Sequence, residues 1–460
     1  MANRIKIQGG QLKSIKNNKI MKALKLILVY LLTCNISYVY TQQELKWRLI
    51  PTAPVNSPGG RYDDVSFINE NAGWAITSDK ENNDFVYKTT NGGISWNESA
   101  DTSLHNLRSI GFADSLNGWL GTLNRTGTVL YNTTNGGSNW LPAVNTAAVD
   151  SLGVCGLFVV NKNVVYGCGR YYGPANLFKT TNGGLNWSIK YLGDQITTLI
   201  DCFFLNKDSG FVVGGIGNSF NTRSGAILFT SDGGDTWINR AVTPPRGQWC
   251  WKISFPDRLH GYVSLEMFNS SPVYFLKTTD GGESWTEKIF LNIYANEEGI
   301  GFMNANTGWL GGWYFNTYKT TDGGDTWNLD PWSYNLNRIR KINDTIAFAA
   351  GRGIYKYSRD TIVGISYVNQ IAAEEYFLYQ NFPNPFNPKT VIRYSLMENG
   401  FVNLKVYNAL GEVVATIVDQ KQNSGSYEVD FNGSNFASGV YFYKLETNNF
   451  TETKRMILLK

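Results

Sequence analysis

The stretch Thr320-Thr321-Asp322-Gly323-Gly324-Asp325-Thr326-Trp327 is the clearest of six copies of one short pattern. The pattern has the form Thr-x-Asn/Asp-Gly-Gly-x-x-Trp, and the other copies begin at Thr89, Thr133, Thr180, Thr230 and Thr278. Their closing tryptophans recur every 42 to 50 residues. A period of this length is typical of propeller blades or of a solenoid.

Each copy predicts a tight hairpin turn, here called the repeat turn. Its third residue carries a side-chain oxygen that can accept hydrogen bonds from turn N–H groups, and the paired glycines allow positive φ. The tryptophan can then pack beneath the sheet. We expect a structural role for the third residue of every copy: Asn91, Asn135, Asn182, Asp232, Asp280 and Asp322.

The repeat turn resembles the Asp-box, or BNR repeat, whose pattern is Ser/Thr-x-Asp-x-Gly-x-Thr/Ser-Trp. The Asp-box is found in sialidases, in sortilin-type receptors and in propellers related to photosystem II assembly factors. Asn139 and Asn186 depart from that pattern at the Ser/Thr position, and the first three copies carry Asn in place of Asp. The resemblance implies a β-propeller in which the box is a folding device on the face away from the ligand.

A second signature precedes the repeat turns: an aromatic residue six positions ahead of a Gly-aromatic pair, as in Phe302 with Gly308-Trp309. It predicts two strands joined by a polar turn, while the repeat turn joins a third strand to a fourth. The sequence therefore predicts six four-stranded blades, at residues 62–100, 106–145, 151–193, 196–242, 249–291 and 297–333.

A seventh blade begins at Asn335 and stops before any strand that carries a repeat-turn tryptophan. The lone strand at Trp47 can complete this blade, and closing the ring in this way removes an open sheet edge. We predict an all-β chain with a seven-bladed β-propeller at residues 42–358. Six and eight blades are the alternatives.

The composition changes after the propeller. Residues 359–375 carry no repeat and are predicted to form a linker. Residues 376–460 contain the turn-rich stretch Phe382-Pro383-Asn384-Pro385-Phe386-Asn387-Pro388 and continue as short alternating strands. This pattern favours a small Ig-like antiparallel β-sandwich.

The C-terminal part closely resembles the type A C-terminal sorting domain of the type IX secretion system. The resemblance runs from Asn381 to Lys460 and rests on the Pro-rich entry and on residues 406–414, 438–442 and 454–457. It implies recognition by the type IX secretion machinery, export across the outer membrane and removal of the domain. The propeller would then be released or anchored at the cell surface. An ordinary interaction domain is the alternative.

The charge distribution suits an exported chain. Residues 1–41 hold seven Lys/Arg and no acidic residue, which leaves 34 basic and 37 acidic residues elsewhere, a net charge of −3. This balance gives no reason to expect nucleic acid or an anionic membrane as a partner. Residues 1–41 are predicted to be a signal peptide with Met21 as the expected start, because an apolar run at 26–32 follows Lys22 and Lys25. The chain is therefore expected to pass through the periplasm.

No metal or cofactor is expected, because the sequence has no His-Cys cluster and no phosphate-binding Gly-rich motif. Four cysteines follow the predicted signal peptide: Cys155, Cys168, Cys202 and Cys250. Export permits disulfides, and Cys155 and Cys168 could meet across neighbouring strands of one blade. Buried free thiols are an equally good interpretation.

A ligand is expected at the ring centre, on the face opposite the repeat turns. That face, here called the loop face, is built from the loops between second and third strands and from the connections between blades. Aromatic rings and arginines there could stack on a sugar or clamp a peptide. The candidates are Arg61, Arg170, Tyr171, Tyr172, Trp249, Trp251, Trp313 and Tyr314.

Two acidic pairs are weak catalytic candidates. Asp63-Asp64 and Glu297-Glu298 each open a blade, and Arg61 precedes the first pair. A solvated rim or a strand cap is the preferred explanation for both pairs.

Three functional classes fit the sequence. The favoured one is a non-catalytic binding or scaffold propeller for a glycan or a protein, at the cell surface or secreted. A sialidase-like glycoside hydrolase is the first alternative, although Arg48-Leu49-Ile50-Pro51 has one residue more than the Arg-Ile-Pro strand of that family. A chaperone role like that of the assembly factors is the second alternative. We therefore expect that the protein is not an enzyme.

Overall fold

The computed structural model describes residues 44–54, 61–78, 84–99, 104–124, 127–145, 153–267, 271–359, 365–369, 375–422 and 424–460. The predicted signal peptide lies outside the described residues. Every regular element in the described part is a β-strand. That part contains no helix long and apolar enough to cross a membrane.

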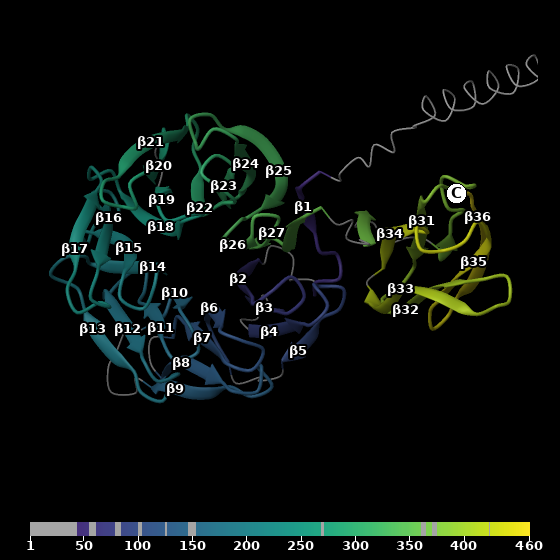
Figure 1. Cartoon of the computed structure of the whole chain (residues 1–460), viewed down its shortest axis with the longest axis horizontal. Coiled ribbons are helices and arrows are strands. Elements are labelled where there is room, and N and C mark those ends of the chain that lie inside the picture. Colours follow the sequence, from purple (N-terminus) through teal and green to yellow (C-terminus); the bar gives the residue numbers. More distant parts are fainter. Residues whose placement is uncertain are drawn as a thin grey trace, which may run out of the picture. The chain divides into compact units, whose positions relative to one another are not determined.

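Seven four-stranded antiparallel sheets form the blades of a propeller (Figure 1). Blade 1 consists of β2 (Tyr62–Phe67), β3 (Gly73–Ser78), β4 (Asp84–Thr89) and β5 (Asn97–Ser99). Blade 2 consists of β6 (Leu107–Phe112), β7 (Gly118–Thr122), β8 (Thr128–Thr133) and β9 (Leu141–Asn145). Blade 3 consists of β10 (Gly156–Val159), β11 (Val165–Cys168), β12 (Asn176–Thr180) and β13 (Ser188–Tyr191). The prediction of seven blades is confirmed.

The remaining blades continue the same order. Blade 4 consists of β14 (Thr198–Phe204), β15 (Gly210–Ile216), β16 (Ser224–Thr230) and β17 (Ile238–Val242). Blade 5 consists of β18 (Gln248–Ser254), β19 (Gly261–Met267), β20 (Val273–Thr278) and β21 (Thr286–Leu291). Blade 6 consists of β22 (Asn296–Phe302), β23 (Gly308–Trp313), β24 (Phe315–Thr320) and β25 (Asn328–Tyr334). Blade 7 consists of β26 (Arg338–Asn343), β27 (Ile346–Ala350), β28 (Ile354–Ser358) and the N-terminal β1 (Lys46–Leu49).

The N-terminal strand closes the ring as predicted. β1 pairs antiparallel with β28, with Trp47 opposite Tyr357. The Trp47 ring stacks on Trp332 at 4.4 Å and meets the edge of Trp309 at 5.6 Å. Trp47 therefore joins the first described strand of the chain to the aromatic core between blades 6 and 7.

The second signature explains how neighbouring blades pack. Its first aromatic residue stacks on the aromatic residue that follows the signature glycine of the preceding blade. Phe302 of blade 6 stacks on Tyr262 of blade 5 at 3.4 Å, and Phe112 stacks on Trp74 at 3.5 Å. These ring pairs repeat around the propeller and supply much of its apolar core.

The repeat turn forms the predicted hydrogen bonds. In the sixth copy, Thr326 N–H donates to Asp322 Oδ1 at 2.9 Å, and Gly324 N–H donates to Thr320 Oγ1 at 2.8 Å. Gly323 N–H donates to the carbonyl oxygen of Asn306, in the turn between the first and second strands of the same blade. The other five copies make the equivalent bond, so the repeat turns and the first turns share one face and the loop face lies opposite.

The C-terminal domain is a sandwich of two antiparallel sheets. One has the order β29 (Ile365–Asn369), β34 (Gly425–Asn432), β31 (Lys389–Leu396) and β30 (Phe377–Leu378), and the other has the order β33 (Val413–Gln422), β32 (Gly400–Tyr407), β35 (Gly439–Glu446) and β36 (Thr451–Leu458). Its core is apolar and includes Leu404, Tyr443 and Met456.

The predicted linker at 359–375 needs one correction. Residues 365–369 form β29, which pairs with β34 in the sandwich, with Ile365 opposite Val429. The sandwich sheet therefore begins before the predicted boundary at residue 376. A five-residue strand outside the repeat carries too little periodicity to be recognised in the sequence.

Candidate functional site

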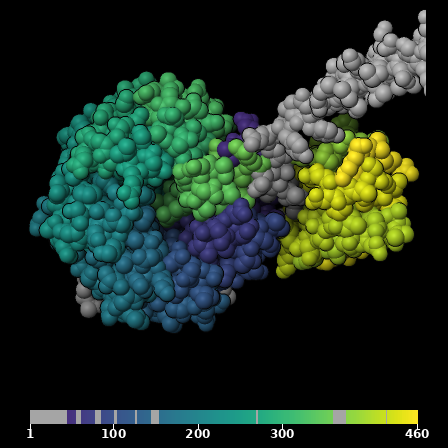
Figure 2. Space-filling view, in the orientation of Figure 1, coloured from purple at the N-terminus to yellow at the C-terminus, as the bar shows by residue number. Residues whose placement is uncertain are grey.

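The first strands of the blades surround the ring centre, and the fourth strands lie at the rim (Figure 1). Figure 2 shows one face of the ring, hollowed at its centre. The first strands carry charged residues that are buried there. The set comprises Asp64 of β2, Arg108 of β6, Asp201 of β14, Lys252 of β18, Glu297 and Glu298 of β22, and Arg338 of β26.

Arg338 connects blade 7 to blade 4 across the ring. Its Nη1 donates to Asp201 Oδ2 at 2.7 Å, and its Nη2 donates to Asp201 Oδ1 at 3.1 Å. The Nε of Arg338 lies 3.2 Å from Asp64 Oδ1, and Arg340 Nη2 donates to Asp64 Oδ2 at 3.0 Å. Burial opposes ionisation of Asp201, but the positive charges of Arg338 and Lys252 lower its pKa below the usual range. These groups therefore act as a buried charged connection between blades 1, 4 and 7.

Arg61 forms a second connection, between blades 1 and 6. It pairs with the carboxylate of Glu298, and its Nε lies 3.3 Å from Asp63 Oδ1. Asp63 also pairs with Arg108 of blade 2. The Arg61 guanidinium lies 3.9 Å over the ring of Trp313, which adds a cation–π contact.

The two acidic pairs do not form the solvated rim that the sequence suggested, although Asp64 accepts hydrogen bonds from the backbone N–H groups of Val65 and Ile110, as a strand cap would. Asp64, Glu297 and Glu298 are fully buried, and the side chain of Asp63 is only 17% exposed. The four residues belong to strands β2 and β22, which line the ring centre. The sequence showed that they open their blades, but their partners lie in distant blades and could not be identified.

Glu297 and a further acid, Glu266, lie near each other, and neither forms an ion pair with a described residue. Neither oxygen of Glu297 has a hydrogen-bond partner among the described residues. Burial raises the pKa of Glu297, and the negative charge of the nearby Glu266 raises it further. Glu266 accepts a hydrogen bond from Trp249 Nε1 at 2.5 Å. Burial and the charge of Glu298 raise the pKa of Glu266 to about 8. Sequence reasoning missed Glu266, although a lone acid in the apolar strand β19 is a usable signal.

Five aromatic rings gather on the loop face of blades 3 to 5. This aromatic cluster consists of Tyr171, Tyr172, Phe220, Trp249 and Trp251, whose neighbouring centroids are 4.3 to 6.4 Å apart. Tyr172 and Phe220 are 54% and 45% exposed, whereas Trp249 and Trp251 are buried in β18. Trp249 therefore supports the exposed rings of Tyr172 and Phe220 from below, whereas Trp251 packs against Tyr171 and Trp249. Neither tryptophan is free to stack on a ligand.

Phe220 was missed in the sequence analysis. It lies between β15 and β16, the same loop position that Tyr171 and Tyr172 occupy in blade 3. Aligning the loops between second and third strands would have found it. Arg223 lies 4.3 Å over Trp249 and 5.2 Å over Phe220, so the cluster also has a buried cation beneath it.

The other predicted ligand-binding residues separate into different places. Trp313 and Tyr314 lie in blade 6 with centroids 5.5 Å apart, and Tyr314 is largely exposed. Arg61 joins them through Trp313. Arg170 packs against Gly153, where its Cγ occupies the space that a side chain at that position would need. The structure thus brings together one aromatic cluster and one Arg61-Trp313-Tyr314 group.

The four described cysteines are free and buried. Cys155 packs with Ile200, Trp249 and Trp251, whereas Cys168 packs in a separate apolar cluster. Cys155 N–H donates to the carbonyl oxygen of Cys168 at 2.7 Å, so the two residues do meet on neighbouring strands, with their thiols unbridged and in different clusters. Within the described ranges, no group of three or more His, Cys, Asp or Glu side chains is arranged to hold a metal ion.

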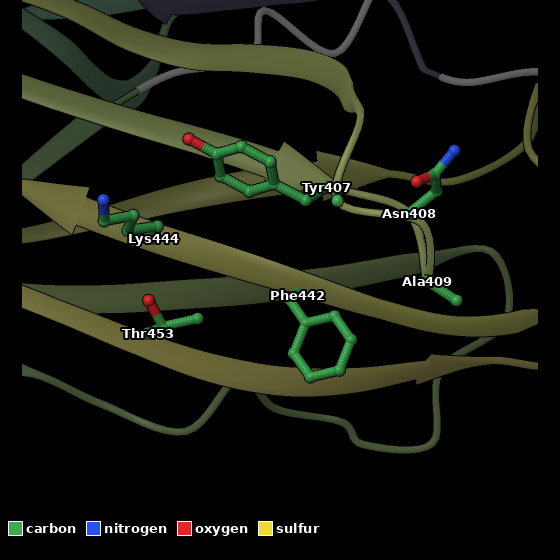
Figure 3. A pocket seen from close by; sticks show the side chains of 7 residues that line it. Tyr407, Asn408, Ala409, Phe442, Lys444 and Thr453 are labelled. Carbon is green, nitrogen blue, oxygen red and sulfur yellow. The ribbon is translucent and has the colours of Figure 1, made fainter.

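The C-terminal domain has its own hollow on the outer side of a sheet (Figure 3). It has a volume of about 310 Å³ and is lined by Tyr407, Asn408, Ala409, Gly411, Phe442, Lys444 and Thr453. Most of these residues belong to two of the segments, 406–414 and 438–442, that carry the sorting-domain resemblance. Leu410, in the adjoining turn, is largely exposed.

Comparisons with known proteins agree with both parts of the fold. Residues 380–459 match the family described as the secretion system C-terminal sorting domain, and residues 82–223 match the family described as photosynthesis system II assembly factor YCF48. The first match indicates that the chain is exported by the type IX secretion system, to the cell surface or the medium.

Two solved structures resemble the propeller. YCF48 bound to D1 peptide has 17% identity and a TM-score of 0.51, over 69% of this chain and 95% of that chain. YCF48 from Cyanidioschyzon merolae has 18% identity and a TM-score of 0.50, over 69% of this chain and 99% of that chain. No protein with a curated description matches this sequence. At these identities the likeness supports the fold alone.

Proposed function

We propose that the protein is an exported binding propeller that holds a glycan or protein ligand on its loop face without chemical turnover. The burial of the acidic candidates carries this proposal. Asp64 and Glu298 are paired with arginines in the ring interior, and Glu297 is buried beside Glu266. A glycoside hydrolase needs two carboxyl groups, or a tyrosine and a carboxylic acid, that reach the substrate.

The exposed aromatic rings support a binding role. Tyr172 and Phe220 stand over the buried Trp249, so their positions are held by packing rather than by a ligand. Rigid, half-exposed aromatic side chains supply apolar contact area at a low cost in conformational entropy. A sugar ring or an apolar peptide side chain would fit such a surface.

The C-terminal domain supports a location of the propeller outside the cell or at its surface. We propose that the chain crosses the periplasm, that the secretion machinery recognises residues 376–460, and that the propeller is then released or anchored at the surface. The structure of YCF48 with a D1 peptide gives one example of a related fold with a bound peptide. That example supports keeping a protein ligand beside a glycan in this proposal.

The test uses the exported full-length chain, offered first to glycan and peptide arrays and then to a panel of fluorogenic glycosides that includes a sialoside. Binding without turnover is expected. Changing Tyr172 and Phe220 together to alanine should weaken binding by roughly tenfold or more, which corresponds to about 1.4 kcal/mol. Tyr191→Ala is the matched control, because Tyr191 is 63% exposed on β13 at the rim.

Two outcomes would contradict the proposal. Turnover that disappears in Asp63→Asn would move the protein to the hydrolases, since Asp63 is the candidate acid that retains some exposure. Equal ligand binding by the double variant and by the Tyr191→Ala control would show that the ligand does not bind at the aromatic cluster.

A further inference from the structure

One exposed tyrosine on the loop face has an unfavourable backbone conformation. Tyr314 lies at the tip of the hairpin between β23 and β24, in which Gly312 pairs with Phe315. Its φ is 62°, a left-handed conformation that a residue with a bulky side chain rarely adopts. Within the described ranges, the other non-glycine residues with positive φ are Asn106 and Asn335, and asparagine tolerates this conformation. Tyr314 is therefore the residue whose conformation needs an explanation.

The end of β25 and the residue after it hold Tyr314 in this conformation. The backbone N–H of Tyr314 donates to Asn335 Oδ1 at 2.8 Å, and the hydroxyl of Tyr334 donates to the carbonyl oxygen of Tyr314 at 2.7 Å. Asn335 is buried, so packing fixes its amide group. Both backbone polar groups of Tyr314 thus have partners within blade 6, and its ring is the part that remains available to a ligand.

The ring of Tyr314 is presented to solvent. The residue is 73% exposed, and its ring centroid lies 5.5 Å from that of Trp313. The buried Arg61 packs against Trp313 and pairs with Glu298, so Trp313 is held in place. Strained backbone conformations that the surrounding structure imposes cluster at ligand-binding positions. Glycine would relieve the strain at position 314 but would also remove the ring, which indicates that the exposed ring is the reason for the tyrosine.

We propose that Tyr314 is a second ligand contact on the loop face and that the ligand is a neutral glycan chain. The proposal rests on the binding function proposed above. Blade 6, which carries Tyr314, lies across the ring from blade 3, which carries Tyr172 (Figure 1). A ligand that contacts both rings therefore extends over the ring centre, which a single sugar cannot do.

The chemistry of the two contacts favours a neutral glycan over a peptide. At both positions the nearby cation is buried against an aromatic ring: Arg61 against Trp313, and Arg223 against Phe220. The exposed surface is therefore an uncharged ring, which suits the apolar face of a sugar. An extended peptide gains much of its affinity from main-chain hydrogen bonds, whereas the N–H and C=O groups of Tyr314 already have partners.

The test titrates the full-length chain with short and long members of several neutral oligosaccharide series, among them cello-, xylo- and malto-oligosaccharides. Long chains of the series that binds should bind roughly tenfold more tightly than its disaccharide, because the second contact adds to the first. Tyr314→Gly should remove this advantage, and so should the Tyr172→Ala/Phe220→Ala variant. Tyr191→Ala, at the rim, should retain it. Tyr314→Phe, which keeps the ring, is the conservative variant and should restore it.

Urea denaturation separates the ring's role in binding from a role in folding. Tyr314→Ala and Tyr314→Gly both lack the ring and should lose the same affinity for long chains. Tyr314→Gly should nevertheless unfold at a higher urea concentration than Tyr314→Ala, because glycine adopts positive φ without strain. If both variants lost stability and kept the full affinity for long chains, Tyr314 would serve only to pack the hairpin and the inference would be overturned.

The remaining outcomes distinguish this inference from the proposed function. A chain-length advantage that survives Tyr314→Gly but disappears in the Tyr172→Ala/Phe220→Ala variant would overturn the second contact and leave the binding propeller intact. Binding of peptides without binding of any neutral oligosaccharide would have the same consequence. A chain that binds neither glycans nor peptides would overturn both proposals.

Discussion

Carboxylates in the ring centre and in the repeat turns serve the same propeller in different ways. Asp201 is buried and pairs with Arg338, which lies 137 residues away in the sequence. Asp322 is exposed and accepts hydrogen bonds from Thr326, four residues away. The ring centre thus joins distant blades through charge, whereas the repeat turn shapes one hairpin through local hydrogen bonds.

The free-energy cost of losing a polar group therefore depends on its burial and on whether its partner belongs to a distant blade or to the same turn. Removing one member of a buried ion pair leaves an uncompensated charge away from water. Removing an exposed acceptor lets water replace it. Substitutions of charged residues in the ring centre should therefore destabilise the propeller more than substitutions in the repeat turns, although the repeat turns are its most visible sequence feature.

The largest effect is expected for Arg338→Met. This change leaves Asp201 without its bidentate partner and weakens the pairing of Asp64, so the free energy of unfolding should fall by about 3–5 kcal/mol. Urea denaturation of the full-length protein measures the loss. Arg240→Met is the matched control, because Arg240 pairs with the exposed Glu283 and should lose no more than about 1 kcal/mol. Equal losses in the two variants would show that the buried ion pair is no more important for stability than the exposed one.

The ring centre also predicts how stability depends on pH. Glu266 has a pKa raised from 4.5 to about 8 by burial and by Glu298, so the folded chain holds a proton that the unfolded chain releases above pH 4.5. That stabilising contribution is fully present below pH 4.5 and is lost as pH rises through about 8. The loss is up to about 5 kcal/mol. Glu297, whose pKa is also raised, contributes with the same sign.

Glu266→Gln should flatten this dependence, because a neutral amide can still accept the hydrogen bond from Trp249. Comparing the unfolding free energies of this variant and of the wild type between pH 5 and pH 8 measures the contribution of Glu266. Lys252, whose pKa burial and Arg338 lower to about 8, affects stability mainly above this window. A Glu283→Gln control on the exposed rim should retain the wild-type slope. If Glu266→Gln also retained it, Glu266 would be excluded as the source.

The same contrast explains which features could be predicted from the sequence. The repeat turns, the aromatic signature and the completion of blade 7 by Trp47 depend on local patterns that recur along the chain. The pairing of Arg338 with Asp201 depends on where blades 4 and 7 meet across the ring, and no local pattern encodes that. The acidic pairs were located correctly at the starts of blades, but their burial follows from the closed ring and was not predicted.

The smallest effect is expected in the repeat turn, where the six natural copies already vary between Asn and Asp. In Asp322, hydrogen bonds from the Thr326 hydroxyl and backbone N–H lower the pKa to about 2, so the residue accepts as a carboxylate at neutral pH. Asp322→Asn retains an acceptor oxygen, as Asn182 does for Asn186 N–H, and should change the unfolding free energy by less than about 0.5 kcal/mol.

Asp322→Ala removes the two carboxylate oxygens that accept hydrogen bonds from Thr326 and should cost about 1 kcal/mol, because water can still reach Thr326. The same urea titrations that measure Arg338→Met give this value. A loss in Asp322→Ala as large as that in Arg338→Met would mean that the repeat turns, and not the buried pairs, hold the ring together. A near-neutral Asp322→Asn beside a measurable Asp322→Ala would show that the turn needs an acceptor but not a charge, which is why three blades function with asparagine in this position.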